Sequence, residues 1–166
     1  MAQAGLREDG KVIVSETGTQ VIADKSSPSH VGRRLGHFLL RLSLGVDMFM
    51  HYIVRELGIS KDFVPVTEKM FVGNLLPMWL VHDFLTVLPY FEALLGVLLL
   101  LGLWTRWTVT AEGLLVTVLL FGTALRSDWT VVSLQMIYLL FVFILLALEE
   151  YNYYSLDRLL ASRRRN

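Results

Sequence analysis

Long apolar stretches, separated by short polar segments, make up most of the chain after residue 33. Residues 75–148 contain only six charged side chains. A helix rises 1.5 Å per residue, so about 20 apolar residues cross the ~30 Å hydrocarbon core of a membrane. The pattern therefore predicts an all-α fold, an integral membrane four-helix bundle, with spans at residues 34–56, 81–103, 107–125 and 131–150.

The connections between the predicted spans differ in length. Two tight turns join the last three spans, so we expect these spans to be antiparallel neighbours. The longer connection between the first two spans indicates an external interfacial segment. Its apolar residues recur at helical spacing, at Phe63, Val66, Met70 and Phe71. We expect Pro77 to end this segment and to begin the second span.

Basic residues near the span ends gather on one side of the predicted bundle. Eight lie in the N-terminal tail, the turn at residues 105–106 and the C-terminal segment, against four on the opposite side. Because short basic segments remain in the cytoplasm, we expect both termini to be cytoplasmic. The first 30 residues lack the apolar core of a signal peptide, so we expect the first span to direct insertion.

The chain divides into a polar tail (1–33), the bundle (34–150) and a basic C-terminal segment (151–166). In the tail, two short apolar runs flank residues 17–19. This arrangement fits a small β-hairpin, but an isolated hairpin is marginally stable in water. A disordered or partner-bound tail fits about as well.

Composition removes several classes of function. The chain is 54% apolar and only 18% charged, it has no net charge, and it contains no cysteine. Without cysteine it has no disulfide framework, thiol redox pair, iron–sulfur cluster or thiolate zinc site. A net charge of zero, without a stripe of basic residues, argues against nucleic acid as a partner.

Polar side chains at membrane depth are costly, so they mark positions that face a bundle interior. An outer layer contains Asp47, His51, Glu92, Gln135 and Tyr138. Asp47 and His51 are four residues apart and share a helix face, an arrangement suited to a proton relay. Asp47, His51 and Glu92 are therefore the candidate catalytic residues. The alternative is that they only position the helices through hydrogen bonds.

An inner layer contains Arg41, Glu112 and Arg106. We expect Arg41 and Glu112 to pair across the bundle and to neutralise each other. The alternative is that Arg41 and Arg106 bind an anion or a lipid headgroup.

The four histidines raise the question of haem. His37 and His51 lie on nearly the same face of the first span, and His82 is at a depth to partner His51. No histidine is placed to partner His37, which argues against b-type haem. We expect no metal site either, because no group of residues has a specific ligand spacing.

The most specific motif runs from Glu92 to Arg106 and reads Glu–x3–Gly–x5–Gly–Leu–x–Thr–Arg. With the residues around it, this motif resembles the DoxX family, and within it the DoxD-like proteins related to the large subunit of thiosulfate:quinone oxidoreductase. The resemblance covers about residues 33–160. Its other matching positions are Arg41, Gly45, Asp47, His51, Phe71, Leu76, Pro77, Pro89, Phe121, Gly122, Thr123 and residues 151–158.

The resemblance implies a four-helix bundle in a bacterial or archaeal cytoplasmic membrane. For DoxD-like members it implies electron transfer into the quinone pool, with Arg41, Glu92 and Arg106 at matching positions. Some members belong to membrane redox complexes, whereas animal relatives act as chaperones for receptor assembly. The thiosulfate enzyme also uses a second subunit, so the resemblance leaves the substrate open.

We therefore expect an integral membrane subunit of a quinone-linked oxidoreductase, with quinone as its cofactor. Its acids and His51 would relay protons. The residues that would hold the quinone are Tyr138 or Gln135 at a carbonyl, Trp79 or Phe91 along the slot, and the basic Arg41 and Arg106. The alternative is a non-catalytic accessory, scaffold or assembly subunit. The expected partners are membrane lipid and other subunits of a membrane or periplasmic redox complex, with a homo-oligomer as an open alternative.

Overall fold

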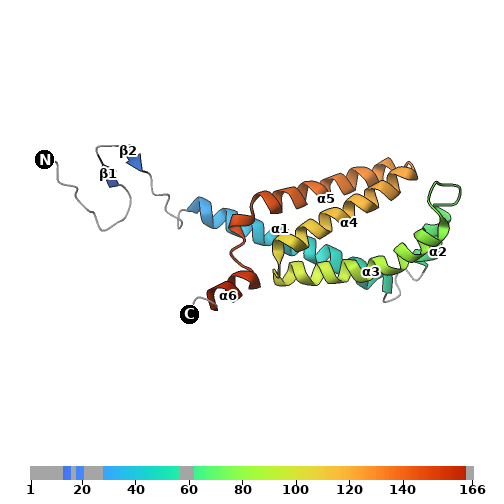
Figure 1. The fold of residues 1–166 in the computed structure, drawn as a ribbon, viewed down its shortest axis with the longest axis horizontal. Helices are drawn as coiled ribbons and strands as arrows, with labels where there is room; N and C mark the ends of the chain where they lie inside the picture. The colour runs from blue at the N-terminus through green and yellow to red at the C-terminus, as the bar shows by residue number, and fades with distance from the viewer. Residues whose placement is uncertain (1–12, 16–17, 21–27, 57–61, 164–166) are drawn as a thin grey trace.

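The computed structural model describes residues 13–15, 18–20, 28–56 and 62–163. Four long helices dominate this part of the chain (Figure 1): α1 (Pro28–Glu56), α3 (Met78–Leu101), α4 (Thr105–Leu125) and α5 (Trp129–Ala147). The shorter elements are the strands β1 (Ile13–Ser15) and β2 (Gly18–Gln20), the helices α2 (Phe63–Lys69) and α6 (Leu156–Arg163), and the 3-10 helix η1 (Glu149–Tyr151).

The long helices form two pairs that are joined to each other. α1 lies along α3, and α4 lies along α5, while further contacts connect α3 to α4 and α1 to α5 (Figure 1). One apolar cluster draws residues from all four helices: Leu44, Leu99, Val109, Val142 and Leu145. Close packing of these side chains holds the two pairs together.

Short turns connect the last three long helices, as the sequence predicts. Residues 102–104 join α3 to α4, and residues 126–128 join α4 to α5. Gly102 ends α3 with a φ of 66°, a left-handed conformation that glycine adopts without strain. Asp128 begins α5, where its side chain accepts a hydrogen bond from the backbone N–H of Val131 at 3.2 Å.

The tightest helix contact is the crossing of α1 and α3 at two glycines. A Cβ added at Gly96 would lie 2.7 Å from the backbone nitrogen of Phe49, and one added at Gly45 would lie 3.0 Å from the backbone nitrogen of Leu100. A side chain at Gly96 would therefore force the helices apart. Small residues at such crossings let two backbones approach closely, as is common between membrane helices.

The two faces of α1 reverse the usual arrangement of a soluble helix. His37 and Arg41 are buried beside Leu44 and Met48. The exposed positions are mainly apolar and include Leu35, Leu39, Val46 and Met50, each about half exposed. An outward apolar face with inward polar groups is the pattern expected where the surroundings are lipid.

Three helices of the described chain, α3, α4 and α5, are long and apolar enough to cross a membrane. They match the second, third and fourth predicted spans, with ends that differ by a few residues. α1 is not among the three, and it begins at Pro28, upstream of the expected start of the first span.

The connection between α1 and α3 is less helical than predicted. α2 spans only Phe63–Lys69, and residues 57–61 lie outside the described residues. Phe71 packs with Val81 and Leu85 of α3, whereas Met70 is exposed. Pro77 directly precedes α3, as predicted.

Little of the N-terminal tail is described, whereas the C-terminal segment is described as far as residue 163. β1 and β2 pair in antiparallel register, with Ile13 opposite Gln20 and Ser15 opposite Gly18. The last two arginines of the basic C-terminal cluster, Arg164 and Arg165, lie outside the described residues.

The glycine crossing makes a prediction about stability. Gly96→Ala should destabilise the protein by about 1–3 kcal/mol, because the new methyl group meets the backbone of α1. Gly36→Ala is the matched control, since a Cβ there meets nothing within 4 Å and alanine favours the helix by about 0.5–1 kcal/mol. Thermal unfolding in detergent, followed by tryptophan fluorescence, measures both. Equal midpoints for the two variants would contradict the proposed close packing.

Candidate functional site

An ion pair joins α1 to α3 near the C-terminal end of α1. The Arg55 guanidinium pairs with the Glu92 carboxylate, and it also stacks on the Phe63 ring at 4.2 Å from the centroid. Glu92 is 1% exposed. Asp47 and His51 lie one turn apart on α1, with a carboxylate oxygen of Asp47 3.9 Å from Nδ1 of His51. The structure thus forms two pairs from the three candidate catalytic residues, Arg55 with Glu92 and Asp47 with His51.

A second group of polar side chains connects α1, α4 and α5. The Asp47 carboxylate interacts electrostatically with Glu112 of α4 and with the Tyr138 hydroxyl of α5. Glu112 is 0% exposed, and neither of its carboxyl oxygens has a hydrogen-bond partner among the described residues. We call Asp47, Glu112 and Tyr138 the acid cluster.

Beside the two free oxygens of Glu112, two more buried polar atoms in and next to the acid cluster have no hydrogen-bond partner among the described residues. One oxygen of Asp47 and Nδ1 of His51 are buried without a hydrogen-bond partner in the described part of the chain, 3.9 Å from each other. A buried carboxyl group without a partner is costly when it is charged. Binding and releasing a proton is the chemistry for which such a group is suited.

The acid cluster is closed at Glu112 and open at its α1 side. The side chains of Asp47 and His51 are 38% and 42% exposed. Val46 and Met50, on the same part of α1, are exposed apolar residues. The side chains of Asp47 and His51 are therefore partly exposed at the surface of the helices, although the Asp47 oxygen and the His51 Nδ1 that lack partners lie beneath it.

The predicted pair of Arg41 and Glu112 is wrong. Arg41 instead donates to two backbone carbonyls, that of Leu99 at 2.7 Å and that of Tyr154 at 2.6 Å. The Leu99 carbonyl lies in the last turn of α3 and also accepts from the Gly102 N–H at 3.1 Å, and the helix dipole favours a cation at this end. Arg41 thus caps α3 and fixes the C-terminal segment, while Glu112 lacks a counter-charge among the described residues.

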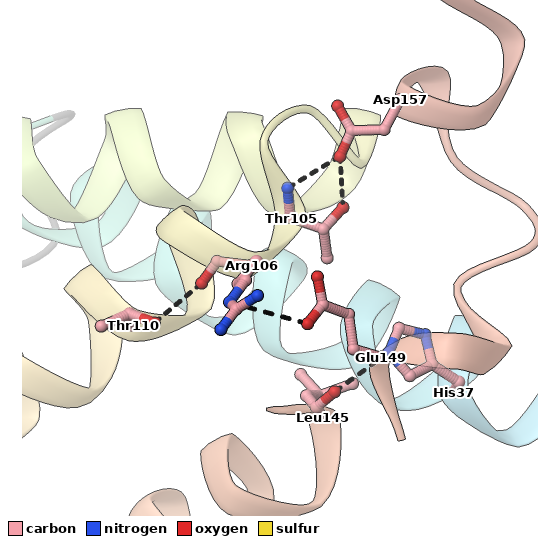
Figure 2. Close-up of polar contacts among 7 residues, drawn as sticks. All are labelled: His37, Thr105, Arg106, Thr110, Leu145, Glu149 and Asp157. Carbon is pink, nitrogen blue, oxygen red and sulfur yellow. Dashed lines mark hydrogen bonds and ion pairs between the residues drawn. The ribbon is translucent and has the colours of Figure 1, made fainter. Parts of the chain in front are cut away.

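Asp157 performs the opposite task at the start of α4. Its carboxylate accepts from the backbone N–H groups of Trp104 and Thr105 at 2.7 and 2.8 Å, and from the Thr105 hydroxyl at 3.1 Å. Figure 2 shows this side chain reaching from α6 to the first residue of α4. The Asp157 N–H in turn donates to the Gly102 carbonyl at 3.2 Å. The α3–α4 turn is therefore held by charges from distant parts of the chain, Arg41 and Asp157.

The structure does not bring the remaining predicted site residues into the acid cluster. Arg106 lies near Glu149 at 3.7 Å on the surface (Figure 2). Gln135 accepts a 2.6 Å hydrogen bond from the Thr123 hydroxyl. Trp79 and Phe91 are 68% and 54% exposed, so they face away from the helix interior.

The histidines have separate environments. Nε2 of His37 lies 3.3 Å from the Leu145 carbonyl at the end of α5 (Figure 2). His82 pairs with Glu68 of α2 rather than facing the interior. Within the described ranges, no group of three or more His, Asp or Glu side chains is placed to hold a metal ion.

From the sequence, Glu112 had only a pairing role with Arg41, and Asp157 had no role beyond its place among the matching positions of the resemblance. Glu112 shares one buried face of α4 with Thr105, Thr108 and Val116, at spacings of three and four residues. That spacing is visible in the sequence and points Glu112 to the interior. No comparable signal identifies Asp157, because it caps a helix from 52 residues away.

The clamp at the α3–α4 turn makes a prediction. Asp157→Ala should lower the free energy of unfolding by about 1–2 kcal/mol, because the two N–H groups at the start of α4 and the Thr105 hydroxyl lose their acceptor. Asp157→Asn should cost less, since its amide oxygen still accepts one of these bonds. Limited trypsin digestion after Arg158, together with the thermal midpoint, measures the release of the C-terminal segment. Ser162→Ala, on the same helix, is the control, and equal digestion of Asp157→Ala and Ser162→Ala would contradict the clamp.

The chain was compared with protein-family models, with curated proteins and with solved structures. None of the three comparisons returned a match. The support for a function therefore has to come from the geometry of the helices and of the acid cluster, together with the motif from Glu92 to Arg106.

Proposed function

We propose that this chain is a four-span, DoxX-like membrane subunit of a quinone-linked oxidoreductase, in which the acid cluster exchanges protons with a quinone. The observation that carries the proposal is Glu112, a fully buried carboxyl group without a partner among the described residues. It lies in a helix apolar enough to cross a membrane. Ionisable residues in such helices mark ion or proton paths and ligand sites.

Two features support α1 as a fourth span. It approaches α3 so closely at Gly45 and Gly96 that both helices share one environment. Its outward residues are mostly apolar, whereas Arg41 and His37 are buried. With four spans, the excess of basic residues places both termini in the cytoplasm and α2 at the external interface. The membrane is the bacterial or archaeal cytoplasmic membrane that the DoxX resemblance implies.

The motif of the resemblance coincides with positions that the helix packing uses. Glu92 pairs with Arg55, and Gly96 forms the close crossing with α1. Gly102 ends α3, and a Cβ there would overlap the Arg41 guanidinium. These coincidences support a DoxX-like bundle, because three of the motif residues, Glu92, Gly96 and Gly102, have a physical role in packing.

The donor set of the acid cluster fits a quinone headgroup. A bound quinone supplies two-electron chemistry and takes up protons as it is reduced. The Tyr138 hydroxyl would donate to a carbonyl oxygen, and Glu112 would hold a proton away from water. Asp47 and His51, the exposed members of the site, would pass protons to Glu112 from the outside.

Topology is tested by single cysteines, which need no prior mutation because the chain has none. We expect Ser15→Cys and Ser162→Cys to react with a membrane-impermeant maleimide only after the cells are opened. Ser127→Cys, in the α4–α5 turn, should react in intact cells. If α1 did not span, Ser15→Cys would instead react on the same side as Ser127→Cys, which would refute the fourth span.

The quinone role is tested on protein purified in mild detergent, by chromatography of the extracted quinone. We expect about one quinone per wild-type chain, and at least a tenfold loss in Tyr138→Phe, which lacks the hydrogen bond. Glu112→Gln should retain the quinone but slow quinone reduction by native membranes at least about 100-fold, the scale of general acid–base catalysis. Asp83→Asn, at an exposed position of α3, is the matched control.

The quinone content and the rate of quinone reduction together distinguish a catalytic role from a scaffolding role. Glu112→Gln keeps the shape of the side chain and removes only its ability to release a proton, so it should fold as well as the wild type. Unchanged quinone reduction in this variant would refute the proton role. Wild-type protein without quinone, purified with partner subunits alone, would instead favour the accessory or assembly function.

A further inference from the structure

A short strap crosses the end of the long helices where α1 ends and α3 begins. It consists of residues 62–76, that is, of α2 and the turn that follows it (Figure 1). The turn is anchored by Phe71, which is 8% exposed and packs with Val81 and Leu85 of α3. The Arg126 guanidinium also lies 5.2 Å from the centroid of the Phe71 ring. None of these groups changes its charge near neutral pH, so this end of the strap is a fixed anchor.

α2 itself is held less firmly than the turn, and none of its residues is buried. The Phe63 ring lies under the guanidinium of Arg55 from α1, with 4.2 Å between the guanidinium carbon and the ring centroid. The Glu68 carboxylate lies 2.5 Å from Nδ1 of His82, in the second turn of α3. Among the residues that the structure describes, this contact is the one hydrogen bond or ion pair between α2 and α3.

The contact between His82 and Glu68 is of a kind that depends on pH. Histidine changes its charge between about pH 5 and pH 8, whereas carboxylates are ionised throughout this range. A protonated imidazole donates a hydrogen bond to a carboxylate and also attracts it by charge, whereas a neutral imidazole retains at most the hydrogen bond. The contact is therefore strong in acid, and it weakens as the pH rises and His82 loses its proton.

No other charged group of the described chain takes the place of either partner. The remaining charged side chains of α2, of the first two turns of α3 and of the α4–α5 turn are Lys69, Asp83, Arg126 and Asp128. Arg126 lies on Phe71, and Asp128 caps α5. Within the described ranges, neither Lys69 nor Asp83 takes part in an ion pair. Glu68 is therefore the charged partner of His82.

We propose that the contact between His82 and Glu68 is a pH-sensitive latch, which holds α2 against α3 in acid and releases α2 as the pH rises. The released helix moves about the anchor at Phe71. The latch is separate from the acid cluster, because neither His82 nor Glu68 belongs to it. It depends on the contacts of the strap and not on the quinone role.

Release of α2 also changes the surroundings of a buried ion pair. Phe63 belongs to α2 and covers the guanidinium of Arg55. Arg55 in turn pairs with Glu92, whose side chain is 2% exposed. When α2 moves away, the Phe63 ring moves with it and water reaches Arg55. The latch therefore regulates how far this ion pair is shielded from water.

The position of α2 is measured on the full chain in detergent by pulsed electron paramagnetic resonance. The distance is taken between spin labels at Val66→Cys on α2 and Ser133→Cys on α5. Both positions are exposed, and the chain has no cysteine of its own. We expect the released fraction to be about two- to fivefold larger at pH 8 than at pH 5, the effect of losing one exposed ion pair.

Substitutions at the latch separate charge from shape. The His82 and Glu68 side chains are 58% and 23% exposed, so changes there leave the packed helices intact. His82→Lys should keep α2 docked at both pH values, since an ammonium group stays charged across the range. His82→Phe should show the larger released fraction at both pH values, and Glu68→Gln should remove most of the pH response. Asp83→Asn, at the neighbouring exposed position, is the matched control and should respond to pH as the wild type does.

Three results would overturn the latch. The first is the same distance distribution at both pH values in the wild type. The second is a pH response that persists in His82→Phe, because another group would then be titrating. The third is release of α2 in His82→Lys at the lower pH, because a permanent charge should hold the helix. The distances are read whether or not quinone is bound, so a failure of the latch is distinct from a failure of the quinone proposal.

Discussion

The close approach of α1 and α3 at Gly45 and Gly96 is the constraint on which the rest of the structure depends. Because neither glycine carries a side chain, the two backbones lie in contact and the registers of both helices are fixed. That register places Arg41 beside the last turn of α3 and Arg55 beside Glu92. A wider spacing would move the Arg41 guanidinium away from the Leu99 carbonyl and Arg55 away from Glu92. The buried side chains of Arg41 and Glu92 would then lose these partners. Packing at two small residues thereby determines which polar groups are satisfied.

The buried polar groups fall into two physical kinds. Arg41 and Glu92 have strong partners, and each such contact connects parts of the chain that are far apart in sequence. Glu112 has no such partner among the described residues, although it is fully buried. Groups of the first kind hold the helices in place. A group of the second kind lowers stability, so its presence calls for a functional explanation. For this reason we assign the chemistry to Glu112 rather than to Glu92, which has a partner in Arg55.

Much of the helix layout could be predicted from the sequence, because apolar length and turn residues decide it: Pro77 before α3, Gly102 after it and Asp128 before α5 all lie at helix ends. The partners of the charges could not. The sequence suggested a carboxylate for Arg41, whereas the partners are carbonyls of Leu99 and Tyr154, which no side-chain pattern identifies. The outward positions of Trp79 and Phe91 were missed for a similar reason. A helix that is apolar on every side carries no signal for which face is buried.

The clamp formed by Asp157 has a consequence for the order in which the protein is completed during its synthesis. Thr105 and its cap are 52 residues apart, so the first turn of α4 is made long before the carboxylate that satisfies it. At about 5–20 residues per second, the ribosome needs roughly 3 to 10 seconds to supply that carboxylate. During this interval the N–H groups of Trp104 and Thr105 lack the acceptor that Asp157 later provides. The segment that carries Asp157 thus caps α4 only after α4 and α5 have both been synthesised.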